Sequence, residues 1–124
     1  YDLGEYQNAI ADYTKAIQLD PVNAGPYNNR GISYRKLGQY QNAINDYTMA
    51  IQLEPTAQRY TERAYAYGLL DQHQNAMNDY TMAIQLEPSG LRYNNRAVSY
   101  YHLGDYTNQQ ADKAAACSLD SQWC

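Results

Sequence analysis

The stretch "YNNRGISYRKLGQYQNAINDYTMAIQLEP", residues 27–55, decides the fold of this chain because the chain repeats it. "YNNRAVSYYHLGDY" starts at residue 93, and "QNAMNDYTMAIQLEP" ends at residue 88. Aligning the sequence on itself places equivalent residues 33 or 34 positions apart. A period of this length indicates stacked units that cannot bury their apolar faces alone. The equivalent sets are Tyr13, Tyr47 and Tyr80; Ala16, Ala50 and Ala83; Pro21, Pro55 and Pro88; Arg30, Arg63 and Arg96; and Tyr34, Tyr67 and Tyr100.

Each unit contains two stretches with helical spacing. Apolar side chains recur three, four and seven positions apart between Ala43 and Leu53, with Gln, Asn, Asp and Thr between them. A second stripe runs from Tyr27 to Leu37. Pro55 ends the second helix and starts the link to the next unit. Each unit is therefore predicted to be a helical hairpin.

The turn inside each hairpin is marked by a residue that favours a positive φ. Gly38 stands at this helix end, and Gly4 and Gly104 repeat it. Asp71 takes the place in the third unit, where a left-handed residue other than Gly costs about 1 kcal/mol.

These residues resemble the tetratricopeptide repeat (TPR) family, in which an aromatic residue, Leu-Gly and Tyr precede Ala, an aromatic residue, Ala and Pro. Here the pattern reads Tyr27-x2-Arg30-Gly31-x2-Tyr34, then Ala43-x3-Tyr47, Ala50 and Pro55, so Tyr replaces the family's Trp and Phe and Arg replaces its Leu. The match covers nearly the whole chain. It implies an all-α fold: a right-handed α-solenoid of antiparallel helix hairpins, or TPR-like superhelix.

The expected organisation is one TPR-type domain over residues 1–124. Residues 1–21 are the second helix of a truncated repeat, 22–55 and 56–88 are repeats, 89–120 are a repeat with a polar capping helix, and 121–124 are a tail. The cap is indicated by Gln109, Gln110 and Lys113, which replace apolar packing residues. The chain is expected to be a fragment of a longer array.

Composition narrows the functional class. The 124 residues carry a formal net charge of −4, with a pI near 4.9, so we expect no nucleic-acid partner. No apolar run approaches the ~18 residues of a membrane span, so no membrane partner is expected. No catalytic constellation appears, so we predict no enzyme activity, and no cofactor or metal site. His73 and His102 lie far apart in the sequence and lack ligand-like spacing. For Cys117 and Cys124 we favour thiols, because a disulfide would need the tail to fold back over the last helix.

On the resemblance, the first helix of each hairpin lines a concave groove that binds a partner protein, as an extended peptide segment. The candidate partner-binding residues are Asn28, Asn29, Ile32, Arg35 and Lys36; Thr61, Glu62 and Tyr65; and Asn94, Asn95, Val98, Tyr101 and His102. Asn29 and Asn95 could hold a peptide backbone through their carboxamides, or could be solvated polar sequence. The family's two-carboxylate clamp is not supplied, because Glu62 stands where a base is wanted and Ile32, Tyr65 and Val98 replace its Asn.

Two further features leave alternatives open. The row Arg30, Arg63 and Arg96 could be a recognition stripe, but we favour stacking on Tyr and pairing with Asp46, Asp79 and Asp112, which share the period. Such pairs, if exposed, would contribute about 0.2–1 kcal/mol each. The first helix, from about Tyr6 to Leu19, lacks its hairpin partner. Either more repeats precede it or the chain self-associates as a scaffold through the partly bare residues Tyr6, Ile10, Tyr13 and Ile17.

Overall fold

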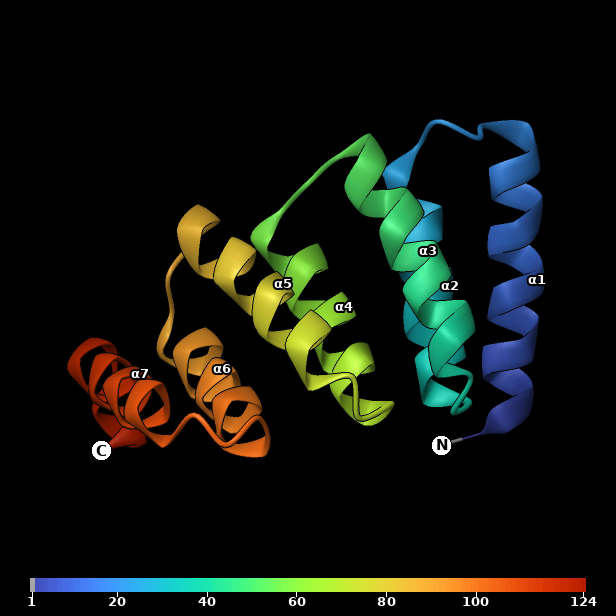
Figure 1. Ribbon diagram of the computed structural model, residues 1–124. Helices are drawn as coiled ribbons and strands as arrows, with labels where there is room; N and C mark the ends of the chain where they lie inside the picture. The colour runs from blue at the N-terminus through green and yellow to red at the C-terminus, as the bar shows by residue number, and fades with distance from the viewer. Residues whose placement is uncertain (1) are drawn as a thin grey trace. The chain divides into compact units, whose positions relative to one another are not determined.

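The computed structural model describes residues 2–124, and all regular structure within them is helical. The helices are α1 (Leu3–Leu19), α2 (Ala24–Lys36), α3 (Tyr40–Leu53), α4 (Ala57–Leu69), α5 (His73–Leu86), α6 (Gly90–His102) and α7 (Tyr106–Leu119), followed by the 3-10 turn η1 (Ser121–Trp123) (Figure 1). The chain divides into two units, Tyr1–Pro55 and Thr56–Cys124, and each is described by itself. In the described residues no helix is long and apolar enough to cross a membrane.

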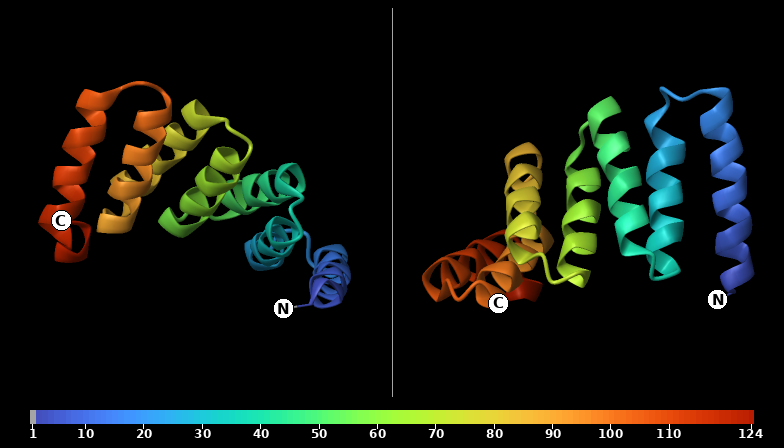
Figure 2. Two further views of the ribbon diagram at one scale, coloured as in Figure 1. Left: turned by 90° about the horizontal axis from the view of Figure 1, so that it is seen from below. Right: turned by 45° about the vertical axis from the view of Figure 1, so that its right-hand side comes forward.

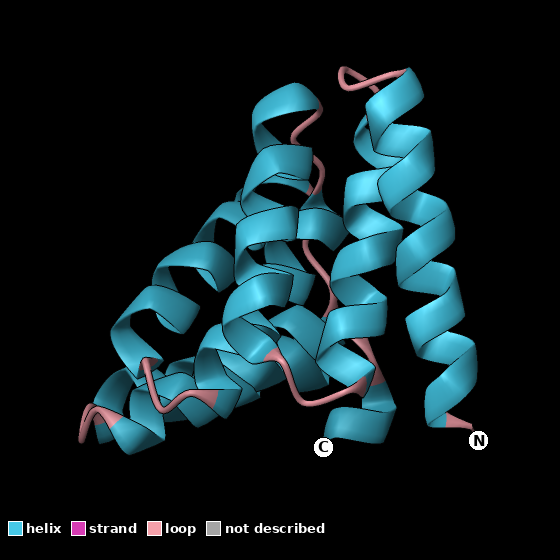
Figure 3. Ribbon diagram, turned by 90° about the vertical axis from the view of Figure 1, so that its right-hand side faces the viewer, coloured by secondary structure: helices cyan, strands magenta, loops and turns pink. Residues whose placement is uncertain are grey.

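Within each unit, consecutive helices pack side by side and antiparallel. In the first unit α2 packs against both α1 and α3, as Figure 2 shows in its right-hand view. In the second unit α4 packs on α5, α5 on α6, and α6 on α7. Short loops join the helices (Figure 3), because each hairpin turn needs only a few residues to reverse the chain.

The hairpin turns have the backbone conformation that the sequence predicts. Gly38 and Gly104 both have φ of 78°, and Asp71, with φ of 59°, is the one residue other than Gly with positive φ among residues 2–124. In each case the next residue donates its N–H to a carbonyl five positions earlier, as Gln72 does to Tyr67 at 2.9 Å. This is the bond that a left-handed residue after a helix makes possible.

The prediction for Gly4 was wrong. It was expected to end a preceding helix, yet it lies inside α1, and its N–H donates to the N-cap Asp2 carboxylate at 2.9 Å. The reason is that Gly38 and Gly104 each follow a helix that must turn back, whereas Gly4 follows none within the chain. The Asp2 cap instead starts α1 at Leu3, so Gly4 lies in its first turn.

In the core of the first unit, the large ring of Tyr47 packs against Gly31, which has no side chain. Tyr47 is fully buried, and a Cβ placed on Gly31 would lie 2.8 Å from its ring, so α2 and α3 approach closely only because residue 31 is Gly. α1 contributes less. None of its described residues is fully buried, and Ile17 packs on the cluster of Ala24, Tyr27 and Ala50.

The core of the second unit uses Ala where the first uses Gly. Tyr80 occupies the place of Tyr47 and packs with Ala64 and Ala76, while Tyr67 covers the cluster. Burial raises the pKa of the Tyr80 hydroxyl, and the charges of Tyr65 and Asp79 add to the effect. Tyr80 therefore remains a neutral phenol in the fold.

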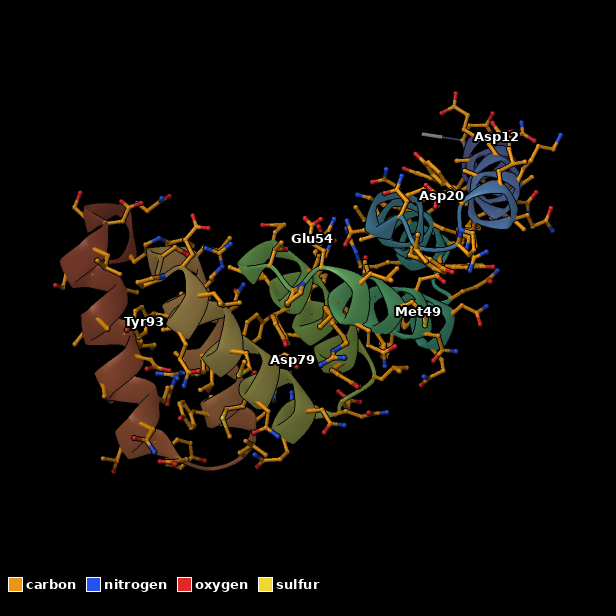
Figure 4. The ribbon with its side chains drawn as sticks, turned by 90° about the horizontal axis from the view of Figure 1, so that it is seen from above. Asp12, Asp20, Met49, Glu54, Asp79 and Tyr93 are labelled. Carbon is orange, nitrogen blue, oxygen red and sulfur yellow. A yellow bond between two sulfur atoms is a disulfide. The ribbon has the colours of Figure 1, made fainter. Side chains whose placement is uncertain are left out.

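The repeated Arg and Asp residues pair as predicted. Arg30 bonds Asp46 through Nε and Nη2, each at 2.7 Å, and Arg63–Asp79 and Arg96–Asp112 have the same two-bond geometry. Each guanidinium also lies 5.6–6.0 Å from the ring centres of two Tyr residues on its own helix. The hydrogen bond to the carboxylate raises the pKa of each Arg, against the opposing effect of burial. Figure 4 labels Asp79 on α5 and Tyr93 on α6.

The estimate for exposed pairs does not apply here, because these pairs are largely buried. Asp46, Asp79 and Asp112 are only 4–5 % exposed, since each carboxylate lies between the two helices of its hairpin. The pairing also reaches a third helix. Arg30 donates to Thr14 on α1, and Arg96 donates to Thr81 on α5, both at 3.1 Å. Each of these two arginines therefore joins its hairpin to the helix before it.

The C-terminal residues fold back on the last hairpin. Cys117 and Cys124 form a disulfide, so the preference for thiols was wrong. The tail can return because η1 turns the chain immediately after α7, with the Asp120 carboxylate accepting from the Gln122 N–H at 3.1 Å. Trp123 then lies over the start of α6, where a Cβ on Gly90 would be 2.5 Å from the indole.

Candidate functional site

The candidate groove residues fall on three helices in the two units. α2 carries five of them, of which Asn29 and Lys36 are exposed, while Asn28, Ile32 and Arg35 are half-buried. In the second unit, Thr61, Glu62 and Tyr65 lie on α4, and Asn94, Asn95, Val98, Tyr101 and His102 lie on α6. The second unit also contains a pocket, which makes it the better-defined candidate site.

The pocket has a volume of about 300 Å³ and lies between α4, α5 and α6. Four candidate groove residues line it: Tyr65, Asn95, Val98 and His102. The residues that α5 contributes were not predicted, because the groove was expected on the first helix of each hairpin; Gly68, Leu69 and Ser99 were not predicted either. The complete lining is Tyr65, Gly68, Leu69, His73, Ala76, Tyr80, Asn95, Val98, Ser99 and His102.

The pocket is apolar inside and carries a few polar groups. Tyr80 and Ala76 are buried, whereas Tyr65, Leu69 and Val98 are 40–50 % exposed. The Asn95 carboxamide supplies both a hydrogen-bond donor and an acceptor. An apolar hollow with a few polar groups is the usual form of a binding site. This site can accept one apolar side chain and hydrogen-bond the backbone that carries it.

Two imidazoles close one side of the pocket. The rings of His73 and His102 stack with centres 4.1 Å apart and planes 10° from parallel. Tyr101 meets His102 edge-on, at 5.5 Å between ring centres, and Tyr106 lies 5.9 Å from Tyr101. The two histidines are far apart in the sequence. They meet because His73 begins α5 and His102 ends α6, and the two helices pack antiparallel.

A second, shallower hollow of about 540 Å³ lies on the other side of the imidazole pair. Its lining is Asp71, Gln72, His73, Gln74, Asn75, His102 and Leu103. The Asp71 side chain is 93 % exposed, and its Oδ1 lies 3.6 Å from His73 Nε2. Over residues 2–124, no three His, Cys, Asp or Glu side chains are placed to hold a metal ion.

Thr61 does not belong to this surface. It is 9 % exposed, its hydroxyl donates to the Ala57 carbonyl, and it accepts a bond from Arg92 Nε at 3.0 Å. The prediction that it faces a ligand was wrong, because α6 places Arg92 over this part of α4. Glu62 is half-buried and accepts from Gln58, while Asn94 and Tyr101 line neither hollow.

Sequence comparison identifies repeats of one kind along the chain. The tetratricopeptide repeat profile matches residues 24–56 and, in a second form, residues 57–89, and a further TPR profile matches residues 1–37. These matches together span residues 1–89. No curated protein gives a significant match.

Solved structures match over most of the chain. A crystal structure of MamA superposes with a TM-score of 0.91 at 22% identity, covering 95% of this chain and 70% of that one. The TPR domain of Arabidopsis OM64 has a TM-score of 0.76 at 30% identity, covering 80% and 84%. The first TPR domain of Spaghetti (RPAP3), bound to the HSP90 peptide SRMEEVD, has a TM-score of 0.76 at 29% identity, covering 82% of this chain and 84% of that one. These matches confirm the predicted all-α fold of antiparallel helix hairpins, and the chain belongs to the tetratricopeptide repeat family.

Proposed function

We propose that this chain, a TPR protein-interaction module, binds an extended peptide segment of its partner and seats one apolar side chain in the pocket between α4, α5 and α6. The observation that carries the proposal is the pocket itself, with its buried Tyr80 floor, its apolar rim and the Asn95 carboxamide. The family is typically one of non-catalytic scaffolds, and the proposal involves no reaction.

The size of the pocket supports a side chain as its occupant. A volume of about 300 Å³ is at the lower end of the range for small-molecule sites. A peptide gains affinity by inserting a single anchor into such a hollow while its backbone stays near the surface. The Asn95 carboxamide lines the same hollow and can bond that backbone as donor and acceptor.

The acidic peptide bound by the Spaghetti domain is a poor guide to the partner of this chain. That peptide, SRMEEVD, contains two consecutive Glu and a terminal Asp. Here Glu62 stands where the family's carboxylate clamp needs a base, and neither hollow is lined by Lys or Arg. Capture of an acidic tail is therefore not part of the proposal.

The test is a selection from a random peptide library displayed on phage, with the wild-type chain as bait. Enriched peptides should share an apolar anchor and lose binding to the Val98→Trp variant, whose indole would fill the pocket, and to Asn95→Ala. Leu91→Trp is the matched control, because Leu91 is also on α6 and 49 % exposed but lies outside the pocket lining. If the peptides bind Val98→Trp as tightly as the wild type, the pocket is not their binding site.

A self-assembling scaffold is the second candidate, and α1 is the feature that favours it. Tyr6, Ile10, Tyr13 and Ile17 are half-buried, and none of the described residues of α1 is fully buried. A second copy could cover these side chains. Light scattering over a hundredfold range of concentration tests this: a mass that stays monomeric throughout would exclude self-association.

A further inference from the structure

Three departures from the repeat meet at one place in the second unit. Position 71 is Asp where the other turns have Gly38 and Gly104. Position 73 is His where the other hairpins have Tyr, and position 102 is His where they have Lys and Leu. The three side chains line the shallow hollow together. Because the repeat folds without them elsewhere, their presence here is not explained by the fold.

Asp71 occupies its position at an energetic disadvantage. Its φ of 59° lies in the left-handed region. Gly38 and Gly104 adopt the same conformation in their turns, but they have no Cβ that would clash there. Gly at this place would relieve about 1 kcal/mol. Residues in such strained conformations cluster at functional sites, so the departure at Asp71 supports a hypothesis of function here.

The shallow hollow favours a positive charge. The shallow hollow offers the exposed Asp71 carboxylate and the amide groups of Gln72, Gln74 and Asn75. No Lys or Arg lines either hollow. Arg63 and Arg96 of the same unit are held by Asp79 and Asp112 inside their hairpins. A cation placed here would meet hydrogen-bond acceptors and the Asp71 carboxylate, which it would share with His73, and no Lys or Arg of the lining would repel it.

We propose that the site selects a basic peptide segment, in which an apolar side chain fills the pocket and a nearby Lys or Arg reaches Asp71 across the His73–His102 pair. This inference rests on the proposed function, because it names the partner chemistry of the same pocket. The stacked imidazoles form the wall shared by the two hollows, so neighbouring peptide side chains can occupy them at once. The partner is thus opposite in charge to an acidic C-terminal tail.

The experiment titrates the isotope-labelled full chain with three synthetic peptides, followed by amide chemical shifts. The peptides are SGLGKKSG, its acidic counterpart SGLGEESG, and SGAGKKSG, which lacks the anchor. The Lys peptide should bind at least about fivefold more tightly than the Glu peptide, with shifts at Asn95, Val98 and His102. Asp71→Gly should lower the affinity for the Lys peptide by about two- to fivefold, and so reduce the difference in affinity between the Lys and Glu peptides.

Two variants help to test the basic-segment inference separately from the proposed peptide-binding function. Asp71→Gly installs the residue that the other turns use, so it should fold at least as well as the wild type. Asp12→Asn is the charge control, since Asp12 is an exposed residue of α1 in the first unit (Figure 4). Equal affinity for the Lys and Glu peptides, or equal effects of Asp71→Gly and Asp12→Asn, would overturn the basic-segment inference alone. Absence of shifts in the pocket with all three peptides would overturn the proposed function as well.

Discussion

The Arg96–Asp112 pair should stabilise the last hairpin far more than a surface ion pair does. Two charge-assisted hydrogen bonds of 2.7 and 2.8 Å join the side chains, and Asp112 is only 4 % exposed. Asp112→Leu would leave the largely buried Arg96 guanidinium without its carboxylate partner. The guanidinium would stay charged, because Arg does not lose its proton in proteins. Breaking one partner of such a pair costs about 3–5 kcal/mol, against about 0.2–1 kcal/mol for an exposed pair.

The assay is a double-mutant cycle in urea, with Asp112→Leu, Arg96→Met and the two combined. Each single change should lower the free energy of unfolding by about 3 kcal/mol, or about 1.5 M in the urea midpoint at a slope near 2 kcal/mol per M. The double variant should recover at least about 2 kcal/mol of the summed loss, because no buried charge remains unpaired. Trp123, the single Trp, reports on this hairpin by fluorescence, and circular dichroism reports on all helices.

The expected coupling of Arg96 and Asp112 is refuted, and so fails, if the single variants lose less than about 1 kcal/mol of stability, since the pair would then behave as an exposed one. It also fails if the two losses simply add in the double variant, because additive effects mean that the side chains are not energetically coupled. Asp12→Asn, an exposed change on α1, should shift the free energy by less than about 0.5 kcal/mol in the same assay.

Three other predictions concern the tail and the pocket. Gly90→Ala should displace Trp123, because its Cβ would lie 2.5 Å from the indole. We expect the free energy of unfolding to fall by about 1–3 kcal/mol, with a lower melting temperature and a shift in Trp emission. An unchanged emission spectrum would contradict the packing of Trp123 on Gly90. Reduction of the Cys117–Cys124 disulfide should release η1 and destabilise the tail by about 2 kcal/mol, the amount for so short a loop. Hydrogen exchange should detect this at α7 and η1, and equal protection with and without reductant would refute it. Because burial raises the pKa of Tyr80, its contribution is present below the ordinary Tyr pKa of about 10 and is lost as pH rises above it. Urea midpoints at pH 8 and pH 11 should therefore differ less for Tyr80→Phe than for the wild type, and equal differences would show that Tyr80 does not contribute.

The regular part of this molecule and its departures from regularity have different meanings. The Arg–Asp pairs and the Tyr rings that flank them recur in three hairpins with nearly the same distances, as expected of groups that hold a repeat together. Asp71, His73 and His102 occur at a single place and line the shallow hollow. Where a repeat protein breaks its own pattern at one place, a binding role is the natural hypothesis.

The sequence by itself determined the repeated hairpin. The 33- or 34-residue period, the positive φ at position 38 and the pairing of Arg30 with Asp46 could all be predicted, because each depends on helical periodicity or on residues within one hairpin. Local rules suffice there, since the turn length and the 3.6-residue helix repeat already place those residues face to face.

Contacts between one hairpin and the next were decided only by the tertiary structure. The stacking of His73 on His102, the bond from Arg92 to Thr61 and the third contact of Arg96 with Thr81 all depend on how one hairpin rotates and slides on its neighbour. That arrangement is the sum of many small packing contacts, and no short motif encodes it. The pocket arises at the same junction. Of its lining, Tyr65, Asn95, Val98 and His102 on α4 and α6 were named in advance, whereas the residues contributed by α5 were not.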